Sequence, residues 1–221
     1  MPQPSKSTVK YPRTGRFFTL NSVSQKTKNV WIVFHGYGQL AEYFIKHFEE
    51  LDASENFIVA PEGLSRFYID GLSGRVGASW MTKEDRDDEI EDQSNYLNLV
   101  LQQCGIDPHS TSHRMIVLGF SQGTATAIRW LAINSIRPTE LILWAGNFPH
   151  DVDADKNPQT FGGLSVQYVH GNEDPFLKEA NMNEKLVELE AMGLKLRSWT
   201  FDGKHVMDRP TLAKIVGSFE P

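Results

Sequence analysis

The residues best suited to chemistry are centred on a serine between two glycines, in the run Gly-Phe-Ser-Gln-Gly at 119–123. An apolar stretch precedes this run and a helix-forming stretch follows it. A serine on a tight turn between a strand and a helix has strained backbone angles, and a glycine two residues away on either side leaves space for the neighbouring strand and helix. The pattern predicts that Ser121 projects its hydroxyl beyond the end of a sheet as a nucleophile.

A serine hydroxyl becomes an effective nucleophile only when a neighbouring base takes its proton, and histidine is the usual base. Turns of this type are followed along the chain by an acid and then by the histidine. Of the seven histidines, only His150, His170 and His205 follow Ser121. His150 precedes every candidate acid, and His170 ends a predicted strand too close to the acid. His205 follows the last predicted strand and is the predicted base.

A carboxylate must hold the histidine in the correct tautomer. Asp174 lies on the turn after a predicted strand, and Pro175 restricts it to extended geometry, which suits a side chain directed across a loop. Glu173 is its immediate rival, and Asp202 is a weaker one that we expect to support the last turn. We predict Asp174 as the acid.

A second glycine-rich loop, His-Gly-Tyr-Gly at 35–38, closes an early predicted strand. Loops in this position supply one backbone N–H to the oxyanion of an acyl-transfer reaction, and the residue after the nucleophile supplies another. We therefore predict the backbone N–H groups of Tyr37 and Gln122 as oxyanion donors, and His35 as a polar anchor of the loop. No phosphate-binding G-x-G-x-x-G or G-K-[ST] pattern follows the loop.

These residues need a scaffold that brings several loops to one edge. Short β-branched or aromatic runs alternate with stretches of helical spacing, which indicates parallel strands joined by helical crossovers. Helices are predicted over Leu40–Leu51, around Ile90–Cys104, after Ser121, around Leu186–Met192 with Gly193 as C-cap, and from Asp208 to near Ser218. The predicted strands are Arg16–Leu20, Val30–His35, Phe57–Ala60, Met115–Phe120, Glu140–Ala145, Ser165–His170 and Lys195–Phe201.

The 221 residues suit one domain, so we expect a flexible tail over 1–15 and a single domain over 16–221. The net charge of −6 argues against nucleic acid and against stable association with an anionic membrane. No apolar stretch is long enough to span a bilayer, and no signal-like apolar segment follows the start, so we expect a cytoplasmic protein. The single cysteine, Cys104, is expected to be a buried small hydrophobe.

A run of carboxylates at 85–92 could suggest a cation site, because hard metals favour several carboxylate oxygens. Carboxylates at the start of a helix also complement its dipole and face water. We take the second interpretation and predict no metal site.

Taken together, the motifs at 35–38 and 119–123, His-Gly-Asn-Glu-Asp at 170–174 and Gly-Lys-His at 203–205 occur in a familiar order. The chain resembles, from Val30 to Ile215, the carboxylesterase, lysophospholipase and acyl-protein thioesterase family of small serine hydrolases. The resemblance implies a Ser, Asp, His triad and hydrolysis of esters or thioesters without a metal or organic cofactor. Tyr37, and Met-Thr-Lys at 81–83, depart from the residues usual in that family.

The expected architecture is an α/β-hydrolase fold with a mostly parallel central sheet flanked by helices. The connection Gly146–Leu164 is too short for a cap domain, so the entrance over Ser121 should be open. We expect hydrolysis of carboxylic esters with short to medium acyl groups through an acyl-enzyme on Ser121. The expected partner is a small-molecule ester, and a homodimer is left open. The residues predicted to line the substrate pocket are Leu72, Trp80, Met81, Phe148 and Met207.

Two alternatives remain at this stage. One is an acyl-thioesterase or a lysophospholipase of the same family. The other is a receptor for small molecules that has this fold and no catalysis, because a fold does not determine function. The combination of a nucleophile, a base, an acid and an oxyanion loop favours an enzyme.

Overall fold

The structure is a computed structural model that describes residues 3–176 and 186–219. Its main feature is a seven-stranded sheet. No end of a predicted strand differs from the observed one by more than one residue, so all seven predictions are confirmed. The strands are β1 (Phe17–Leu20), β2 (Asn29–Phe34), β3 (Asn56–Pro61), β6 (Arg114–Phe120), β7 (Glu140–Trp144), β8 (Ser165–Gly171) and β9 (Lys195–Phe201).

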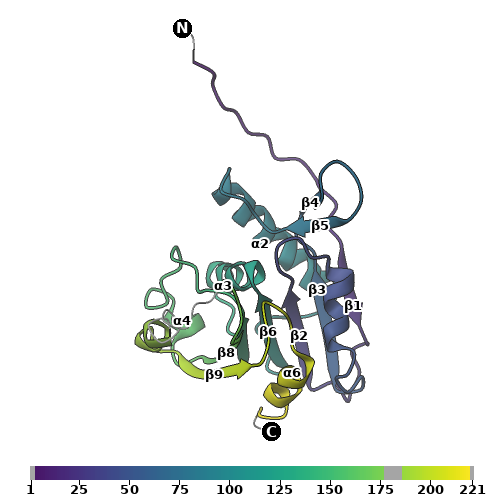
Figure 1. The fold of residues 1–221 in the computed structure, drawn as a ribbon, viewed down its shortest axis with the longest axis vertical. Coiled ribbons are helices and arrows are strands. Elements are labelled where there is room, and N and C mark those ends of the chain that lie inside the picture. The colour runs from purple at the N-terminus through teal and green to yellow at the C-terminus, as the bar shows by residue number, and fades with distance from the viewer. Residues whose placement is uncertain (1–2, 177–185, 220–221) are drawn as a thin grey trace.

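The strands lie in the order β1-β3-β2-β6-β7-β8-β9. Figure 1 shows β1 and β3 toward one end of this sheet and β8 and β9 toward the other. Only β1 runs antiparallel to its neighbour, and the other six strands are parallel. The loops that follow the parallel strands therefore meet at one edge of the sheet, which is where open α/β sheets bind their ligands. This topology is the mostly parallel α/β sheet that the sequence predicts.

Helices cover both faces of the sheet (Figure 1). Two long helices pack on one face, and the shorter first and last helices pack on the other. The helices with both ends described are α1 (Ala41–Phe44), the 3₁₀ helix η1 (Ile45–Phe48), α2 (Arg86–Gln103), α3 (Gln122–Asn134), α4 (Pro158–Phe161) and α6 (Arg209–Val216), and residues 186–191 are also helical.

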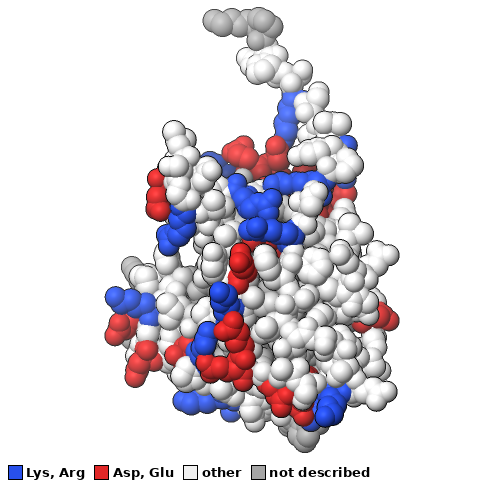
Figure 2. Space-filling model, turned by 90° about the vertical axis from the view of Figure 1, so that its right-hand side faces the viewer, with Lys and Arg blue, Asp and Glu red and all other residues white. Residues whose placement is uncertain are grey.

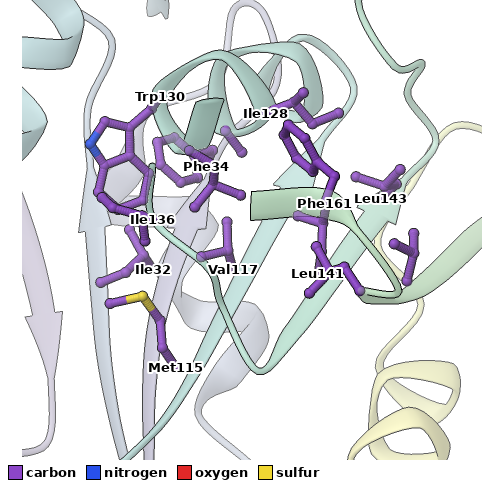
Figure 3. Packing of buried hydrophobic residues seen from close by; sticks show 14 of the residues in the cluster. Ile32, Phe34, Met115, Val117, Ile128, Trp130, Ile136, Leu141, Leu143 and Phe161 are labelled. Carbon is purple, nitrogen blue, oxygen red and sulfur yellow. The ribbon is translucent and has the colours of Figure 1, made fainter. Parts of the chain in front are cut away.

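The core has two halves because side chains alternate across each buried strand. On β2, Ile32 and Phe34 pack under α2 and α3, whereas Trp31 and Val33 pack under α1, η1 and α6. Figure 3 shows the first half, in which Trp130 on α3 lies beside Phe34. Burial on both faces explains why the central strands are continuous apolar runs.

The structure corrects the prediction of one helix over Leu40–Leu51. The structure has a single α-helical turn, α1, followed directly by the 3₁₀ helix η1. The tighter 3₁₀ turn aligns residues three apart, so Ile45 and Phe48 both reach the core against the sheet. The apolar spacing in this segment was therefore interpreted correctly as one buried face, but not as one continuous helix.

A second, two-stranded sheet was missed. It is a hairpin of β4 (Ser65–Tyr68) and β5 (Val76–Ser79). Both strands are short. β4 is half exposed, β5 is mostly buried, and the tip carries Leu72, which is 96% exposed. Strands of four residues, separated by a loop with glycines at 71 and 74, give only a weak strand signal in the sequence. It packs beside the loop after β2, because Gly38 donates a hydrogen bond to the carbonyl of Ala78.

The starts of α2 and α6 lie where the charged and capping residues of the sequence predict them. Acidic residues fill the first turn of α2, where they complement the helix dipole. At α6, the Asp208 carboxylate accepts a hydrogen bond from the backbone N–H of Thr211, at 2.9 Å. Asp208 is thus the N-cap that its position before Pro210 predicts.

The described part of the tail, residues 3–15, forms no helix or strand and is exposed. Its lysines pair with the acidic helix α2, as in the contact of Lys10 with Glu91 at 2.6 Å. No described helix is both long and apolar enough to cross a membrane. Cys104 is half-buried rather than buried, and it packs against the core. On the face shown in Figure 2, basic and acidic side chains lie close together, without a broad field of one sign.

Candidate active site

Ser121 lies at the turn between β6 and α3, with backbone angles of φ 53° and ψ −117°. A positive φ is unusual for a residue other than glycine, so the backbone of this turn is strained. A Cβ on Gly119 would overlap the backbone of Thr124, and one on Gly123 would overlap the carbonyl of Phe34. The two glycines are therefore required by close packing on both sides of the turn, as the sequence predicts.

The structure brings the three predicted catalytic side chains into one chain of hydrogen bonds. His205 Nε2 lies 2.9 Å from Ser121 Oγ, and His205 Nδ1 lies 2.7 Å from Asp174 Oδ2. The Asp174 side chain is fully buried, and its other oxygen accepts a hydrogen bond from the backbone N–H of Phe176. The carboxylate therefore favours the tautomer with the proton on Nδ1, which leaves Nε2 free to accept the serine proton.

The loops that carry the acid and the histidine are fastened to each other. The side chain of Asn172 donates to Asp202 Oδ1 at 2.7 Å and accepts from the backbone N–H of Gly203 at 3.1 Å. The indole N–H of Trp144 donates to the carbonyl of Val206, next to His205. Asn172 lies inside a motif that the sequence reading singled out, but its positioning function was missed because it depends on a pairing between two loops.

The rival residues lie outside this hydrogen-bond chain. Glu173 is exposed. The Asp202 carboxylate accepts a hydrogen bond from Asn172, which agrees with the expectation that Asp202 supports the last turn. His170 is half-buried on β8, where burial lowers its pKa, and its Nε2 lies 3.4 Å from the hydroxyl of Thr200. His150 is exposed at the rim of the cavity over Ser121.

The two predicted oxyanion donors are available for a ligand. In the described part of the chain, no backbone hydrogen bond uses the N–H of Tyr37 or of Gln122. Gln122 is the first residue of α3, where the backbone N–H groups have no partner inside the helix. The N-terminus of α3 adds the positive end of the helix dipole at the same place.

His35 holds the loop of Tyr37 in place, as expected. Its Nδ1 lies 2.8 Å from the carbonyl of Gly36, and its Nε2 accepts a hydrogen bond from the backbone N–H of Gly63 at 3.0 Å. The ring is fully buried against Trp80, and burial lowers the pKa of His35 to about 4. The buried ring is therefore neutral at neutral pH, with its proton on Nδ1.

The side chain of Gln122 has a second function that the sequence reading missed. Its amide group accepts a hydrogen bond from the backbone N–H of Trp80 at 3.1 Å and donates to the carbonyl of Met81 at 2.9 Å. It also contacts the hydroxyl of Ser79. These bonds fasten the end of β5 to the turn that carries Ser121. Gln122, the residue after the predicted nucleophile, therefore braces the turn through its side chain.

A cavity of about 970 Å³ opens over Ser121 and His205. The ring of Phe176 packs against His205 with an edge-on geometry, at 4.8 Å between ring centres. Tyr37 covers another side, stacked on Phe67 of the hairpin. The remaining described lining residues are Arg86, Ala125, Arg129, Ala145, Gly146, Asn147, Phe148, Pro149, His150 and Asp151.

Of the predicted pocket residues, only Phe148 lines this cavity among the described residues. Trp80 is 1% exposed and packs between Phe34 and His35, because its large ring and its N–H are both satisfied in the core. Met207 is also a core residue, in the half under α6. Both predictions were wrong.

Two other predicted pocket residues lie elsewhere. Leu72 is at the exposed tip of the hairpin, away from the cavity lining. Met81 is not among the lining residues, and its sulfur is 3.4 Å from the guanidinium of Arg129. The wrong pocket predictions have one common cause. The side chains of this loop were assigned by their apolar character, which does not reveal whether a side chain faces the core, the solvent or the cavity.

The charged wall of the cavity was not predicted. Arg129 on α3 makes a two-pronged ion pair with Asp151, at 2.9 and 2.8 Å, and Arg86 from the start of α2 contacts the same carboxylate at 2.7 Å. The hydrogen bonds from Arg129 hold the pKa of Asp151 well below its usual range. One signal was present in the sequence, because Ser121, Ala125 and Arg129 are four residues apart and so share one helix face.

The arrangement has the parts required for acyl transfer from an ester to water. Ser121, His205 and Asp174 are hydrogen-bonded in sequence, and the backbone N–H groups of Tyr37 and Gln122 make no backbone hydrogen bond within the described residues. Among the described residues, no group of three or more His, Cys, Asp or Glu side chains is placed to hold a metal ion.

Known structures share this fold. The esterase PE8 is 19% identical, with a TM-score of 0.69, and the match covers 93% of this chain and 97% of that one. The Bacillus cereus carboxylesterase is 17% identical, with a TM-score of 0.65 and 91% of each chain covered. Acyl-protein thioesterase 2 of Zea mays is also 17% identical, with a TM-score of 0.63, and the match covers 92% of this chain and 97% of that one.

No curated protein matches the chain in sequence. The model of the phospholipase/carboxylesterase family matches residues 17–217, which is nearly the whole chain and includes every residue of the hydrogen-bond chain described above. The mostly parallel sheet, the turn at Ser121 and the order of the loops agree with that match. The chain therefore belongs to the phospholipase/carboxylesterase family and has the α/β-hydrolase fold.

Proposed function

We propose that this protein is a serine esterase that hydrolyses carboxylic esters of short to medium acyl length through an acyl-enzyme on Ser121. The observation that supports this most strongly is the continuous hydrogen-bond chain from the buried Asp174 through His205 to Ser121. Each distance is short enough for proton transfer without a change of rotamer.

In the first half of the reaction, Ser121 Oγ attacks the ester carbonyl while His205 Nε2 takes its proton. Asp174 stabilises the imidazolium that forms, and it remains ionised. His205 then gives the proton to the leaving alcohol oxygen as the tetrahedral intermediate collapses. The alcohol leaves, and the acyl group stays bound to Ser121 as an ester.

The charge that develops on the carbonyl oxygen is stabilised by the backbone N–H groups of Tyr37 and Gln122. Donors fixed in advance are effective because they need no reorganisation during the reaction, and each contributes about 3–4 kcal/mol in comparable sites. The bonds of His35 to Gly36 and Gly63 hold one donor, and the side chain of Gln122 braces the turn that carries the other.

In the second half, a water molecule replaces the alcohol. His205 takes a proton from the water, and the resulting hydroxide attacks the acyl carbonyl. The oxyanion forms in the same place, and the proton returns to Ser121 as the acid is released. The sequence of steps uses only groups of this chain and water.

The cavity supports a limit on acyl length. The connection Gly146–Leu164 holds only the short helix α4, and it encloses no long channel in the described residues. Phe148 and Ala125 offer apolar surface near Ser121, and each buried methylene contributes roughly 0.8 kcal/mol. Further along, a long alkyl chain would meet the charged groups Arg86, Arg129 and Asp151. We therefore expect kcat/KM to rise over the first few methylenes and to fall for long chains.

The experiment measures hydrolysis of 4-nitrophenyl esters from acetyl to palmitoyl by the wild type and by Ser121→Ala. We expect a maximum of kcat/KM at short to medium length, and a loss of roughly 10⁴-fold or more in the variant. Hydrolysis that is unchanged in Ser121→Ala contradicts the proposed nucleophile. A steady increase up to palmitoyl contradicts the proposed acyl length and favours a lysophospholipase or thioesterase.

A further inference from the structure

The wall of the cavity formed by α2, α3 and the loop after β7 contains more positive than negative charge. Two guanidinium groups, of Arg86 and Arg129, share one carboxylate, that of Asp151. The pKa of Asp151 is held well below its usual range by Arg129, so this carboxylate stays ionised and the three groups keep one net positive charge. This local surplus contrasts with the net charge of the whole chain, which is −6.

Most of the excess positive charge in this group belongs to Arg86. Arg129 uses two of its nitrogens on Asp151, and its third lies on the sulfur of Met81. Arg86 contacts Asp151 through Nη2, and its side chain is 34% exposed, against 13% for Arg129. Asp87 lies 3.9 Å from another nitrogen of Arg86, but the Asp87 side chain is 98% exposed, so water screens that pair. Arg86 therefore has N–H donors available to a ligand in the cavity.

The position of this wall relative to Ser121 follows from α3. Ser121, Ala125 and Arg129 line the same cavity at intervals of four residues. Arg129 is eight residues beyond Ser121, which corresponds to about 12 Å along the helix axis. Its side chain tilts back toward the start of the helix, so the guanidinium comes closer to Ser121 than that. The cationic wall is thus within reach of an acyl group of moderate length.

The two halves of an ester can be assigned to the two sides of the cavity. His205 must protonate the leaving oxygen, so the alcohol part has to lie on the side of His205 and Phe176. The acyl part then extends away from His205, along α3 past Ala125 to Arg129. An acyl chain bound in this direction ends at the cationic wall.

Resting on the esterase function proposed above, we propose that the preferred substrates are half-esters of dicarboxylic acids, in which the free carboxylate of the acyl part binds Arg86 beside the Arg129–Asp151 pair. A guanidinium binds a carboxylate through charge-assisted hydrogen bonds, with two parallel N–H groups where the geometry allows. Arg86 and Arg129 are specificity residues in this proposal, and they take no part in proton transfer. The apolar surface of Phe148 would contact the methylenes between the two carbonyl groups.

The test compares 4-nitrophenyl half-esters of succinic to suberic acid with 4-nitrophenyl esters of neutral acyl chains of matched length. For each length, the quantity measured is the ratio of kcat/KM for the anionic ester to that for the neutral one. We expect a ratio above one that is largest at an intermediate length. We also expect the ratio to decrease as salt is added, because the cavity is open to water.

Arg86→Gln should lower this ratio roughly tenfold to a hundredfold, the range expected for loss of one charged hydrogen-bond contact. Arg197→Gln is the matched control, because it removes the same charge from an exposed position on β9 that does not line the cavity. It should leave both rates as in the wild type. Melting curves of each variant show whether it is folded.

The outcomes separate the two proposals. A wild type that hydrolyses neutral esters but prefers them to half-esters at every length overturns the carboxylate site and leaves the esterase function standing. The same holds if the half-esters are preferred equally by the wild type and by folded Arg86→Gln. A wild type that hydrolyses neither series overturns both proposals together.

Discussion

His205 Nε2 lies 2.9 Å from Ser121 Oγ, although the two residues are 84 positions apart in the chain. The contact joins the loop after β9 to the turn after β6, at the carboxyl edge of the parallel sheet. On its other side the imidazole is held by Asp174, whose side chain is excluded from water. The orientation of the His205 ring thus depends on a buried carboxylate, and removal of that carboxylate tests the proposed base.

Asp174→Asn should lower kcat by roughly 10⁴-fold, because an amide in this place favours the wrong histidine tautomer. Glu173→Gln is the matched control, since its exposed side chain lies outside the hydrogen-bond chain, and it should retain most of the activity. The measurement is kcat on a 4-nitrophenyl ester for both variants. A large loss of kcat in Glu173→Gln, together with activity near that of the wild type in Asp174→Asn, would show that Glu173 is the acid.

Gln122→Met should affect both stability and turnover. The substitution keeps the length of the side chain and the backbone N–H, but it removes the bonds to Trp80 and Met81. Unpaired groups at these positions should reduce the free energy of unfolding by about 1–3 kcal/mol, and a looser turn should lower kcat.

Urea unfolding and ester hydrolysis measure the two effects. Gln103→Met on the exposed end of α2 is the control, and we expect it to behave as the wild type. A Gln122→Met variant with unchanged stability and kcat would show that the side chain does not brace the turn.

Stability should depend on pH through His35. Its pKa in the folded protein is about 4, whereas an unfolded histidine has a pKa of about 6.5. Between these values the unfolded chain binds a proton that the folded chain does not, so the free energy of unfolding rises with pH in this window. The contribution is fully present above pH 6.5 and decreases by roughly 3 kcal/mol as the pH falls to 4.

Urea unfolding of the wild type and of His35→Asn between pH 4.5 and 8 measures this dependence. Burial also lowers the pKa values of His47 and His170, so the wild type keeps some slope from these residues. The variant should be less stable at pH 8 and should have a smaller slope below pH 6.5. A slope equal to that of the wild type would exclude His35 as its source.

Much of the hydrogen-bond chain could be predicted from sequence because each part has a local signal. The turn at Ser121 is identified by its glycines and by its flanking strand and helix. Once a parallel sheet is inferred, the loops after its strands must meet at one edge, which places Asp174 and His205 near the serine. No side-chain packing has to be known for these steps.

The cavity could not be predicted in the same way, because its walls depend on which way side chains point. Trp80 was expected in the cavity, but packing against Phe34 and His35 buries it in the core. Arg86, Arg129 and Asp151 come from three separate segments, and only the folded chain shows that they meet. The apolar or charged character of a residue does not indicate such a meeting.

The most direct test of the account is covalent labelling of the nucleophile. The wild type and Ser121→Ala are treated with a fluorophosphonate probe, and the labelled peptide is identified by mass spectrometry. We expect one phosphonyl group on Ser121 in the wild type and no labelling in the folded variant. Labelling that persists in Ser121→Ala, or a folded wild type that takes up no probe, would contradict the claim that Ser121 is an activated nucleophile.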